Sequence, residues 1–373
     1  MVLILKIIAT KENLLDGINA VQKAVSNKNT IPILSGIFLK AVDNNLFFTA
    51  TDLEIGIECR VPVQVIEEGE IVLPARHFSE LVRKLPNTKI IINYLADIIG
   101  VSIQYDDAEV NLKGWPGEEF PLIPELEGNF SIEVETNILK NMIKQTLFAT
   151  ATDDNRPIFT GVLFELENNE LHMVATDTHR LALRSGMLKN NQDKNISIII
   201  PGKTLGEVNR IIKEDDEALI IKGNMNQVSF ETQDTKIISR IIEGKFPNYK
   251  QVIPQEYKSL LKVKTKAFQE TIERANLFSS EKDGTSIIKL VMDKGFLKIT
   301  SRSEMGKVEE KITIFSEGES IEISFNAKYL LDALKIIDTE DLNITLSGPL
   351  SPGIIRSGNH NNFVYLILPL RTV

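Results

Sequence analysis

The stretch SGIFLKAVDNNLFFTATD, residues 35–52, decides the fold because it reappears twice further along the chain. The second copy is TGVLFELENNELHMVATD at 160–177, and the third is TSIIKLVMDKGFLKITSR at 285–302. The copies begin 160 − 35 = 125 and 285 − 160 = 125 residues apart. Apolar residues that alternate around a polar turn predict two antiparallel strands in each copy. The constant period predicts three diverged copies of one domain.

Two further anchors repeat at nearly the same spacing. A strand that ends in Pro74, Pro201 or Asn326 leads each time into an amphipathic helix, at intervals of 201 − 74 = 127 and 326 − 201 = 125 residues. A Phe-Pro pair followed by Ile-Pro closes the first two copies, and 246 − 120 = 126 residues separate Phe120 from Phe246. Proline-rich connectors are typical of linkers. We therefore predict domains at residues 1–127, 128–254 and 255–373.

Each copy is predicted to carry two amphipathic helices on antiparallel sheet, an α+β arrangement. The first strand of each copy is expected at a sheet edge, and Thr136 and Thr265 are expected at or near helix N-caps. The predicted helices span residues 13–25, 77–85, 137–149, 203–213, 266–278 and 327–337.

Composition limits the class of protein. The chain has 373 residues, 43% of them hydrophobic, and a single cysteine, Cys59, within an alternating run typical of a strand. One cysteine allows no disulfide within the chain, which suits a reducing compartment. Lys6 interrupts the apolar stretch at residues 1–9, so this stretch is expected to form a first strand and not a signal peptide. No apolar run reaches the length of a membrane span, and a cytoplasmic location without membrane contact is expected.

Charge is unevenly distributed over the chain. The net charge is −9, which by itself disfavours binding of nucleic acid by bulk attraction. The six predicted helices, however, contain 12 basic and 6 acidic residues, a net charge of 12 − 6 = +6, so the remainder carries −9 − 6 = −15. If the helices face one way, that face attracts phosphate. The alternative is that these basic side chains simply cover solvated helix faces.

Catalytic motifs are weak in this sequence. Gly202-Lys203-Thr204 looks like the end of a P-loop, but Ser197 stands where that motif needs its first glycine. None of the four histidines is spaced as a metal ligand, and no cofactor is expected. His179 beside Asp177 is the one arrangement that suggests a general base, so a hydrolase-type enzyme stays an alternative. A non-ring adaptor of repeated domains is another.

An ordered set of segments carries a family resemblance. These are residues 175–182 (ATDTHRLA), 246–249 (FPNY) with 252–254 (VIP), 325–334 (FNAKYLLDAL) and 365–371 (YLILPLR). Together they resemble the bacterial DNA sliding clamps, the β subunit of DNA polymerase III. The resemblance covers the whole chain and implies a non-catalytic processivity factor for DNA replication. In that family two chains form a head-to-tail homodimer ring, helices line the hole, and duplex DNA is held topologically without sequence recognition.

The resemblance also implies partners and site residues. The expected partners are the polymerase III catalytic subunit, a clamp loader that opens the ring, and other polymerases and repair proteins that carry clamp-binding peptides. The implied peptide pocket between the second and third domains comprises Phe159, Thr176, Thr178, His179, Arg180, Leu181, Pro247, Val252, Asn326, Tyr329, Leu366, Ile367, Leu368, Pro369, Leu370 and Arg371. The implied DNA contacts are Lys28, Arg76, Arg83, Arg156, Lys203 and Arg210. The implied dimer contacts are Val110, Leu112, Leu277 and Phe278.

Some positions depart from the family pattern. Pro157 and Ile158 stand where aromatic residues are common, Thr178 where glycine is common, and Gln251 where the rim is frequently basic. Thr178 is therefore expected to narrow the pocket. A simpler interpretation of the C-terminal run, residues 365–371, is an ordinary last strand. Pro369 favours a position at a sheet edge, which a peptide could use.

Overall fold

The structure is a computed structural model that describes residues 5–26, 30–153, 155–188, 195–213, 218–279, 281–282, 285–358 and 362–371. Packing divides the chain into two compact units, Met1–Thr136 with Glu207–Ile241, and Asn137–Gly206 with Ile242–Val373. The division between them cuts through the second sequence repeat, because the sheets run on without a break from one repeat into the next.

All six predicted helices form, each within a few residues of its expected bounds. They are α1 (Lys11–Val21), α2 (Ala75–Lys84), α3 (Thr136–Leu147), α4 (Gly202–Ile211), α6 (Thr265–Asn276) and α7 (Ala327–Leu334). The sequence did not predict α5 (Tyr249–Val252), a single turn inside the second Phe-Pro…Ile-Pro segment. Short 3-10 helices, η1 to η4, lie at Gln22–Ala24, Pro32–Ser35, Gly117–Glu119 and Pro157–Phe159.

The helix starts follow local chemistry. Thr10 caps α1, since its side chain accepts a hydrogen bond from the backbone N–H of Asn13. Thr136 is the first residue of α3, as its predicted place at or near the cap requires. Thr265 is likewise the first residue of α6, directly after the N-cap Lys264, and its hydroxyl donates to the carbonyl of Thr339 instead of capping the helix.

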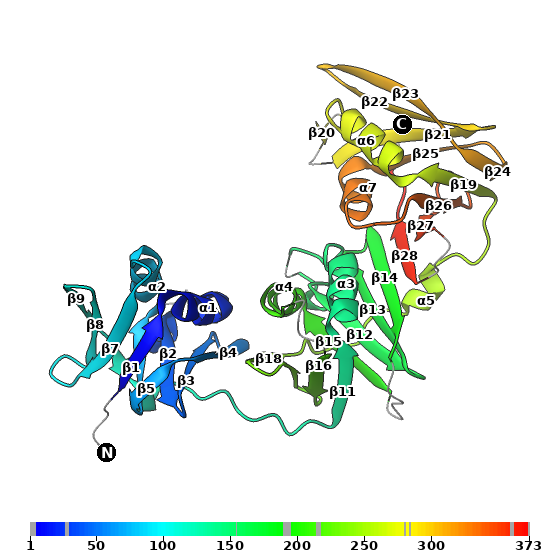
Figure 1. Cartoon of the computed structure of the whole chain (residues 1–373). Helices are drawn as coiled ribbons and strands as arrows, with labels where there is room; N and C mark the ends of the chain where they lie inside the picture. The colour runs from blue at the N-terminus through cyan, green and yellow to red at the C-terminus, as the bar shows by residue number, and fades with distance from the viewer. Residues whose placement is uncertain are drawn as a thin grey trace. The chain divides into compact units, whose positions relative to one another are not determined.

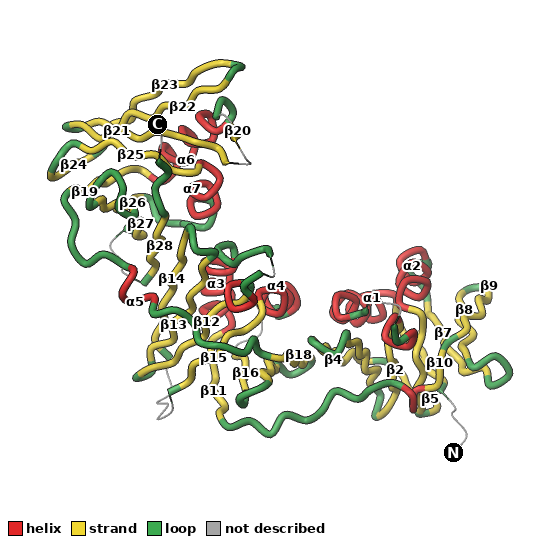
Figure 2. The backbone as a smooth tube through the Cα atoms, turned by 180° about the vertical axis from the view of Figure 1, so that it is seen from behind, coloured by secondary structure: helices red, strands yellow, loops and turns green. Residues whose placement is uncertain are grey.

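The first unit contains two sheets (Figures 1 and 2). The five-stranded sheet has the order β5 (Gln64–Glu67), β1 (Lys6–Thr10), β7 (Lys89–Leu95), β8 (Gly100–Tyr105), β9 (Ala108–Lys113). The nine-stranded sheet has the order β10 (Trp115–Pro116), β6 (Gly69–Pro74), β2 (Gly36–Val42), β3 (Asn45–Thr51), β4 (Ile55–Pro62), β18 (Thr235–Arg240), β17 (Gln227–Glu231), β16 (Ala218–Gly223), β11 (Phe130–Glu135). Helices α1 and α2 pack side by side; α1 also contacts β3 and β4, and α2 contacts β2 and β6.

The second unit repeats this plan. Its nine-stranded sheet has the order β15 (Ile196–Pro201), β12 (Gly161–Glu167), β13 (Glu170–Thr176), β14 (Arg180–Met187), β28 (Phe363–Ile367), β27 (Gly353–Ser357), β26 (Asp341–Leu346), β19 (Ser259–Lys264), β24 (Phe315–Gly318). The five-stranded sheet has the order β20 (Glu281–Lys282), β21 (Thr285–Asp293), β22 (Phe296–Ser303), β23 (Gly306–Thr313), with β25 (Ile321–Asn326) also paired to β21. Helices α6 and α7 pack against each other beside β21.

The order of elements confirms the three-copy α+β fold. Each copy runs strand, helix, three strands, one or two connecting strands, helix, three strands: β1 to β9, β11 to β18 and β19 to β28, where the third copy adds the two-residue β20 after its first helix. The expectation that the first strand of each copy lies at a sheet edge is correct for β11 alone. Strand β1 lies between β5 and β7, and β19 between β24 and β26, because an extra strand pairs with each of them.

Two strand pairings join neighbouring copies. At the first seam β4 pairs with β18, and Gly56 lies opposite Ile238. At the second seam β14 pairs with β28, and Leu181 lies opposite Leu366. Both seams therefore pair the same two kinds of strand. One is the third strand after the first helix of a copy, β4 or β14, and the other is the last strand of the next copy, β18 or β28. The strand of the first kind in the third copy is β23, and the strand of the second kind in the first copy is β9. Neither takes part in a seam, and each lies at the edge of its sheet, so these two are called the outermost strands.

Candidate functional site

A five-residue turn builds the predicted site beside the second seam. The Thr176 hydroxyl donates to the Arg180 carbonyl at 2.6 Å and accepts from the Thr178 N–H at 3.1 Å. The Asp177 carboxylate accepts from the N–H groups of His179 at 2.9 Å and Arg180 at 3.0 Å. Thr178 has φ +77°, the left-handed region that favours glycine. This conformation explains why a glycine suits the position.

Arg180 anchors this turn to the third copy. Its side chain is 9% exposed and donates to Asp177 at 2.9 Å, to Asp332 at 2.6 Å and to the Phe148 carbonyl at 2.9 Å. The guanidinium also lies 4.3 Å from the centre of the Tyr329 ring. Burial opposes the charged form of Arg180, but the hydrogen bond that it donates to Asp332 and the nearby acidic groups outweigh burial, and the net effect raises the pKa of Arg180. The arginine is therefore a fixed cation that holds Asp332 on α7 and the turn together.

The last strand is interior, so the expectation that Pro369 marks a sheet edge is wrong. Strand β28 pairs with β14 on one side and β27 on the other. Pro369 comes after the strand ends, where a missing N–H disrupts no ladder. On either side of it the Leu368 N–H donates to the His179 carbonyl at 2.9 Å, and the Leu370 N–H donates to the Ser324 carbonyl at 2.8 Å. The C-terminal tail is thereby tied to both the turn and the third copy.

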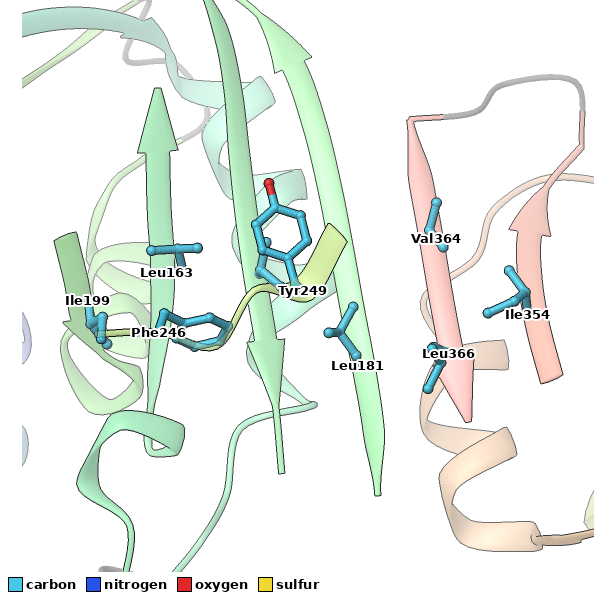
Figure 3. Packing of buried hydrophobic residues seen from close by; sticks show 9 residues of the cluster. Leu163, Leu181, Ile199, Phe246, Tyr249, Ile354, Val364 and Leu366 are labelled. Atoms are coloured by element: carbon cyan, nitrogen blue, oxygen red, sulfur yellow. The ribbon is translucent and has the colours of Figure 1, made fainter. Parts of the chain in front are cut away.

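An apolar cluster crosses the second seam (Figure 3). Leu181 and Leu366 come from the two paired strands, and Phe246 and Tyr249 cover the sheet from the connector. The other buried members are Leu163, Val174, Ile199, Ile354 and Val364. Val252 is 51% exposed and precedes Ile253, which packs against the cluster, and Leu368 is 38% exposed two residues after Leu366. Apolar side chains at the surface over a buried apolar base form the kind of surface that holds a peptide anchor.

The remaining predicted pocket residues differ in what they do. His179 is exposed, and its ring stacks on Tyr329 with 6.4 Å between centroids. Phe159 is buried with its edge toward Phe246, 6.3 Å between centroids. Asn326 is buried and caps α7 by accepting a hydrogen bond from the Lys328 N–H, so it is a structural residue of the site.

Several members of the site were missed by the sequence analysis. Tyr249 lies within the connector, as the first residue of α5, and its hydroxyl donates to Glu165 at 2.7 Å. Asp332, the partner of Arg180, is 152 residues away in sequence. The apolar alternation of β12 and β13 indicates buried faces, but nothing in a single sequence says that Asp332 meets Arg180.

The enzyme alternative fails on geometry. Both oxygens of Asp177 are occupied by the turn and by Arg180, so this acid does not orient the His179 ring. The first copy builds the same turn without a histidine: Thr51 donates to the Ile55 carbonyl at 2.9 Å, and Asp52 accepts from the N–H groups of Glu54 and Ile55. Leu53 has φ +72° there. The Thr-Asp pair is a turn-building device of the repeat.

The predicted DNA contacts occupy different environments. Arg76 is paired with Glu80 but its side chain is 84% exposed, and Arg83 donates to Gln22 at 2.8 Å. Arg156 and Lys203 are exposed. Arg210 is different, because its guanidinium donates to Glu207 and to the α1 carbonyls of Asn19 and Ala20. Lys28 lies outside the described residues.

The predicted dimer contacts flank the two outermost strands. Val110 and Leu112 point to one face of β9 and are half-buried. Leu277 is 77% exposed just after α6. Phe278 follows it and lies against Gly306, the first residue of β23. Val110 and Leu112 therefore lie on the edge strand β9, and Leu277 and Phe278 lie near the edge strand β23.

Other chemistry is sparse. No group of three or more histidine, cysteine or acidic side chains that could hold a metal occurs among the described residues. No helix in the described parts of the chain is long and apolar enough to cross a membrane. Cys59 is a buried strand residue of β4, as predicted, and burial raises the pKa of its thiol.

Fold and site together define a class: a protein of three repeated α+β domains whose most charged turn is a structural device of the repeat. Comparison with known proteins specifies it further. Models of the N-terminal, central and C-terminal domains of the DNA polymerase III beta subunit match residues 5–124, 133–248 and 250–371. The beta sliding clamp of Bacillus subtilis is 38% identical, over 99% of this chain and 100% of its own length. That of Halalkalibacterium halodurans is 39% identical, over 95% of this chain and 96% of its own length.

Solved structures agree. The crystal structure of the Bacillus subtilis sliding clamp matches with a TM-score of 0.94 over 99% of this chain and all of that one. The crystal structure of the DNA polymerase III beta subunit from Thermotoga maritima matches with a TM-score of 0.91 and 28% identity, over 99% of this chain and 100% of that one. The chain belongs to the DNA polymerase III beta subunit family, the beta sliding clamps. It is a processivity factor of DNA replication and a non-catalytic polymerase subunit, as the sequence predicted, and the hydrolase alternative is discarded.

Proposed function

We propose that two copies of this chain join head to tail into a closed ring around duplex DNA. The observation that carries this proposal is the pattern of seams. Both internal seams pair strands of two fixed types, β4 with β18 and β14 with β28, and the outermost strands β23 and β9 are of those same types. Pairing β23 of each chain with β9 of the other chain continues this pattern of strand pairing and leaves neither strand with an unpaired edge.

The two edges suit each other chemically. Strand β9 carries Glu109 and Lys113, and β23 carries Lys307 and Lys311 beside acidic residues. Mixed signs on both strands permit opposite charges to face each other across a pairing. Leu277 and Phe278, with Val110 and Leu112, then supply the apolar contact at each joint.

The DNA would be held by the helix-borne cations. Arg76 and Arg83 on α2, Lys203 on α4 and Arg156 before η4 are exposed and could reach phosphates without specifying sequence. Arg210 contributes least, because its guanidinium already has three partners. A ring needs only weak contacts, since topology prevents dissociation.

A retention experiment tests the ring. The protein is loaded by a clamp loader onto nicked circular DNA and isolated by gel filtration, and half the sample is then linearised with a restriction enzyme. We expect retention on circles and loss from linear molecules through their ends. Equal retention on both forms would show that direct DNA affinity, and not encirclement, holds the protein.

The second-seam surface is proposed to dock peptides with leucine and phenylalanine anchors from the polymerase III catalytic subunit, the clamp loader, other polymerases and repair proteins. Support comes from the exposed Val252 and Leu368, which are near members of the buried cluster in the chain. On this proposal Thr178, in its left-handed turn, narrows the surface, and the exposed Gln251 stands at its rim. A cytoplasmic location follows from these partners.

A truncation tests the docking surface. Removing residues 368–373 takes away Leu368 but keeps β28 whole, whereas a cut at Leu366 would remove two buried residues of an interior strand. We expect at least a tenfold loss of affinity for a polymerase-derived peptide, about 1.4 kcal/mol, with the dimer mass unchanged. Unchanged peptide affinity would refute the assignment.

A further inference from the structure

The first seam reproduces the frame of the second one. Its turn has the same hydrogen bonds and a positive φ at Leu53, as at Thr178. The Arg240 N–H donates to the Glu54 carbonyl at 3.0 Å, just as the Leu368 N–H donates to the His179 carbonyl at 2.9 Å. Arg240 thus takes the place of Leu368, and Glu54 that of His179.

This frame encloses a cavity of about 250 Å³ in the first unit. Its floor is β4 and β18, where Gly56 faces Ile238, and its wall is the first Phe-Pro…Ile-Pro connector. The Ile123 side chain lies over Gly56, where an added Cβ would meet it at 2.7 Å. Because Gly56 has no side chain, Ile123 of the connector can lie directly over the strand beside the cavity.

The cavity has apolar margins. Leu53 is 47% exposed and Leu122 is 79% exposed, and both line it. The volume lies below the roughly 300–1,000 Å³ typical of small-molecule pockets. It suits one or two aliphatic side chains of an extended peptide better than a larger ligand.

Arg240, which lines the cavity, favours a ligand with a negative charge. Arg240 is exposed and forms no ion pair with any residue that the structure describes. At the second seam the equivalent position is the apolar Leu368. A carboxylate next to the aliphatic anchor would meet Arg240, an interaction that the second-seam surface does not offer from that position.

We propose that the first seam is a second peptide-docking site, which takes an extended segment with an aliphatic anchor followed by an acidic residue. The inference rests on the proposed docking at the second seam only for the choice of a peptide as the ligand class. A protein partner could then engage both seams of one chain through two short segments, which raises its effective concentration.

The test uses the full chain with isoleucine δ1 methyl groups labelled for NMR. The probe is the capped pentapeptide Ala-Leu-Asp-Leu-Ala, and its matched control has Asn in place of Asp. Leu368→Asp is introduced to weaken the second-seam surface. We expect saturable shifts of the Ile55, Ile123 and Ile238 methyls, which line the first-seam cavity. Ile354 and Ile367 report on the second seam.

Two exposed substitutions test the role of charge. Arg240→Glu is expected to weaken binding of the aspartate probe about fivefold, and Arg240→Lys to keep it within about twofold, in line with exposed ion pairs. The asparagine probe should be indifferent to Arg240→Glu. No saturable shift at the three first-seam methyls overturns the inference. If these three methyls do not shift but the methyls of Ile354 and Ile367 shift in the wild-type protein, the first-seam inference is wrong and the proposed peptide docking at the second seam is retained.

Discussion

Leu277 offers the sharpest test of the ring interface. Its side chain is 77% exposed in the single chain, so Leu277→Ala removes almost no packing from the folded domain. Full burial of a leucine contributes about 1.5–3 kcal/mol, and burial of the exposed part contributes about 1–2 kcal/mol at one joint. A head-to-tail ring of two chains has two joints, so the dimer should lose about 2–4 kcal/mol in total.

This loss corresponds to a dimer Kd raised between about 30-fold and several hundredfold. Sedimentation equilibrium over a concentration series measures it, and the same variant should leave circular DNA sooner. Leu350→Ala is the matched control, because Leu350 is 64% exposed and lies between β26 and β27, in a sheet that contains neither β9 nor β23. The control should leave the Kd unchanged.

Two results would refute the reasoning. A Kd within twofold of wild type for Leu277→Ala would place this side chain outside the interface. An equal effect of Leu350→Ala would show that the loss is not specific to the joint. Thermal unfolding followed by circular dichroism checks that both variants keep the stability of the folded chain, as their exposure requires.

Three further outcomes follow from the site and the charges. Arg180→Ala should lower the free energy of local opening of β14 and β28 by about 3 kcal/mol, because it leaves Asp332 and the Phe148 carbonyl without the donor that they have in the folded chain. Hydrogen exchange should show this loss in β14 and β28 and no change in β2 and β3. Burial raises the pKa of Tyr365 and Tyr249, so the folded state favours the neutral phenols; stability is full below the unfolded pKa of about 10 and falls as pH rises above it. Tyr365→Phe should reduce that alkaline loss in a denaturation series, and an unchanged pH dependence would contradict the assignment. Replacing Arg76 and Arg83 together by alanine should reduce the salt slope of DNA binding by up to about 2, while Arg210→Ala should change the slope little and weaken the contact of α4 with α1; an Arg210 effect as large as that of the pair would contradict this ranking.

Local pattern was enough for the elements and the copy number. The 125-residue period, the alternation around each Asn-Asn or Lys-Gly turn and the helical spacing of apolar residues are properties of neighbouring residues. They predicted all six longer helices and the α+β repeat. The domain boundaries near residues 128 and 254 remain predictions, because the sheets continue across the seams and packing does not separate the copies there.

Tertiary structure decided which strands meet and which charges are already occupied. The sequence by itself determined the three copies, the family resemblance and the candidate residues around His179. It did not show that β28 is interior, that Arg210 caps α1 or that Asp332 binds Arg180, because each depends on residues far apart in the chain. The physical reason is that secondary structure follows short-range periodicity, whereas strand order and buried ion pairs follow from how the copies pack. The same packing places Arg240 where the second seam has Leu368, and so gives two similar frames different chemistry.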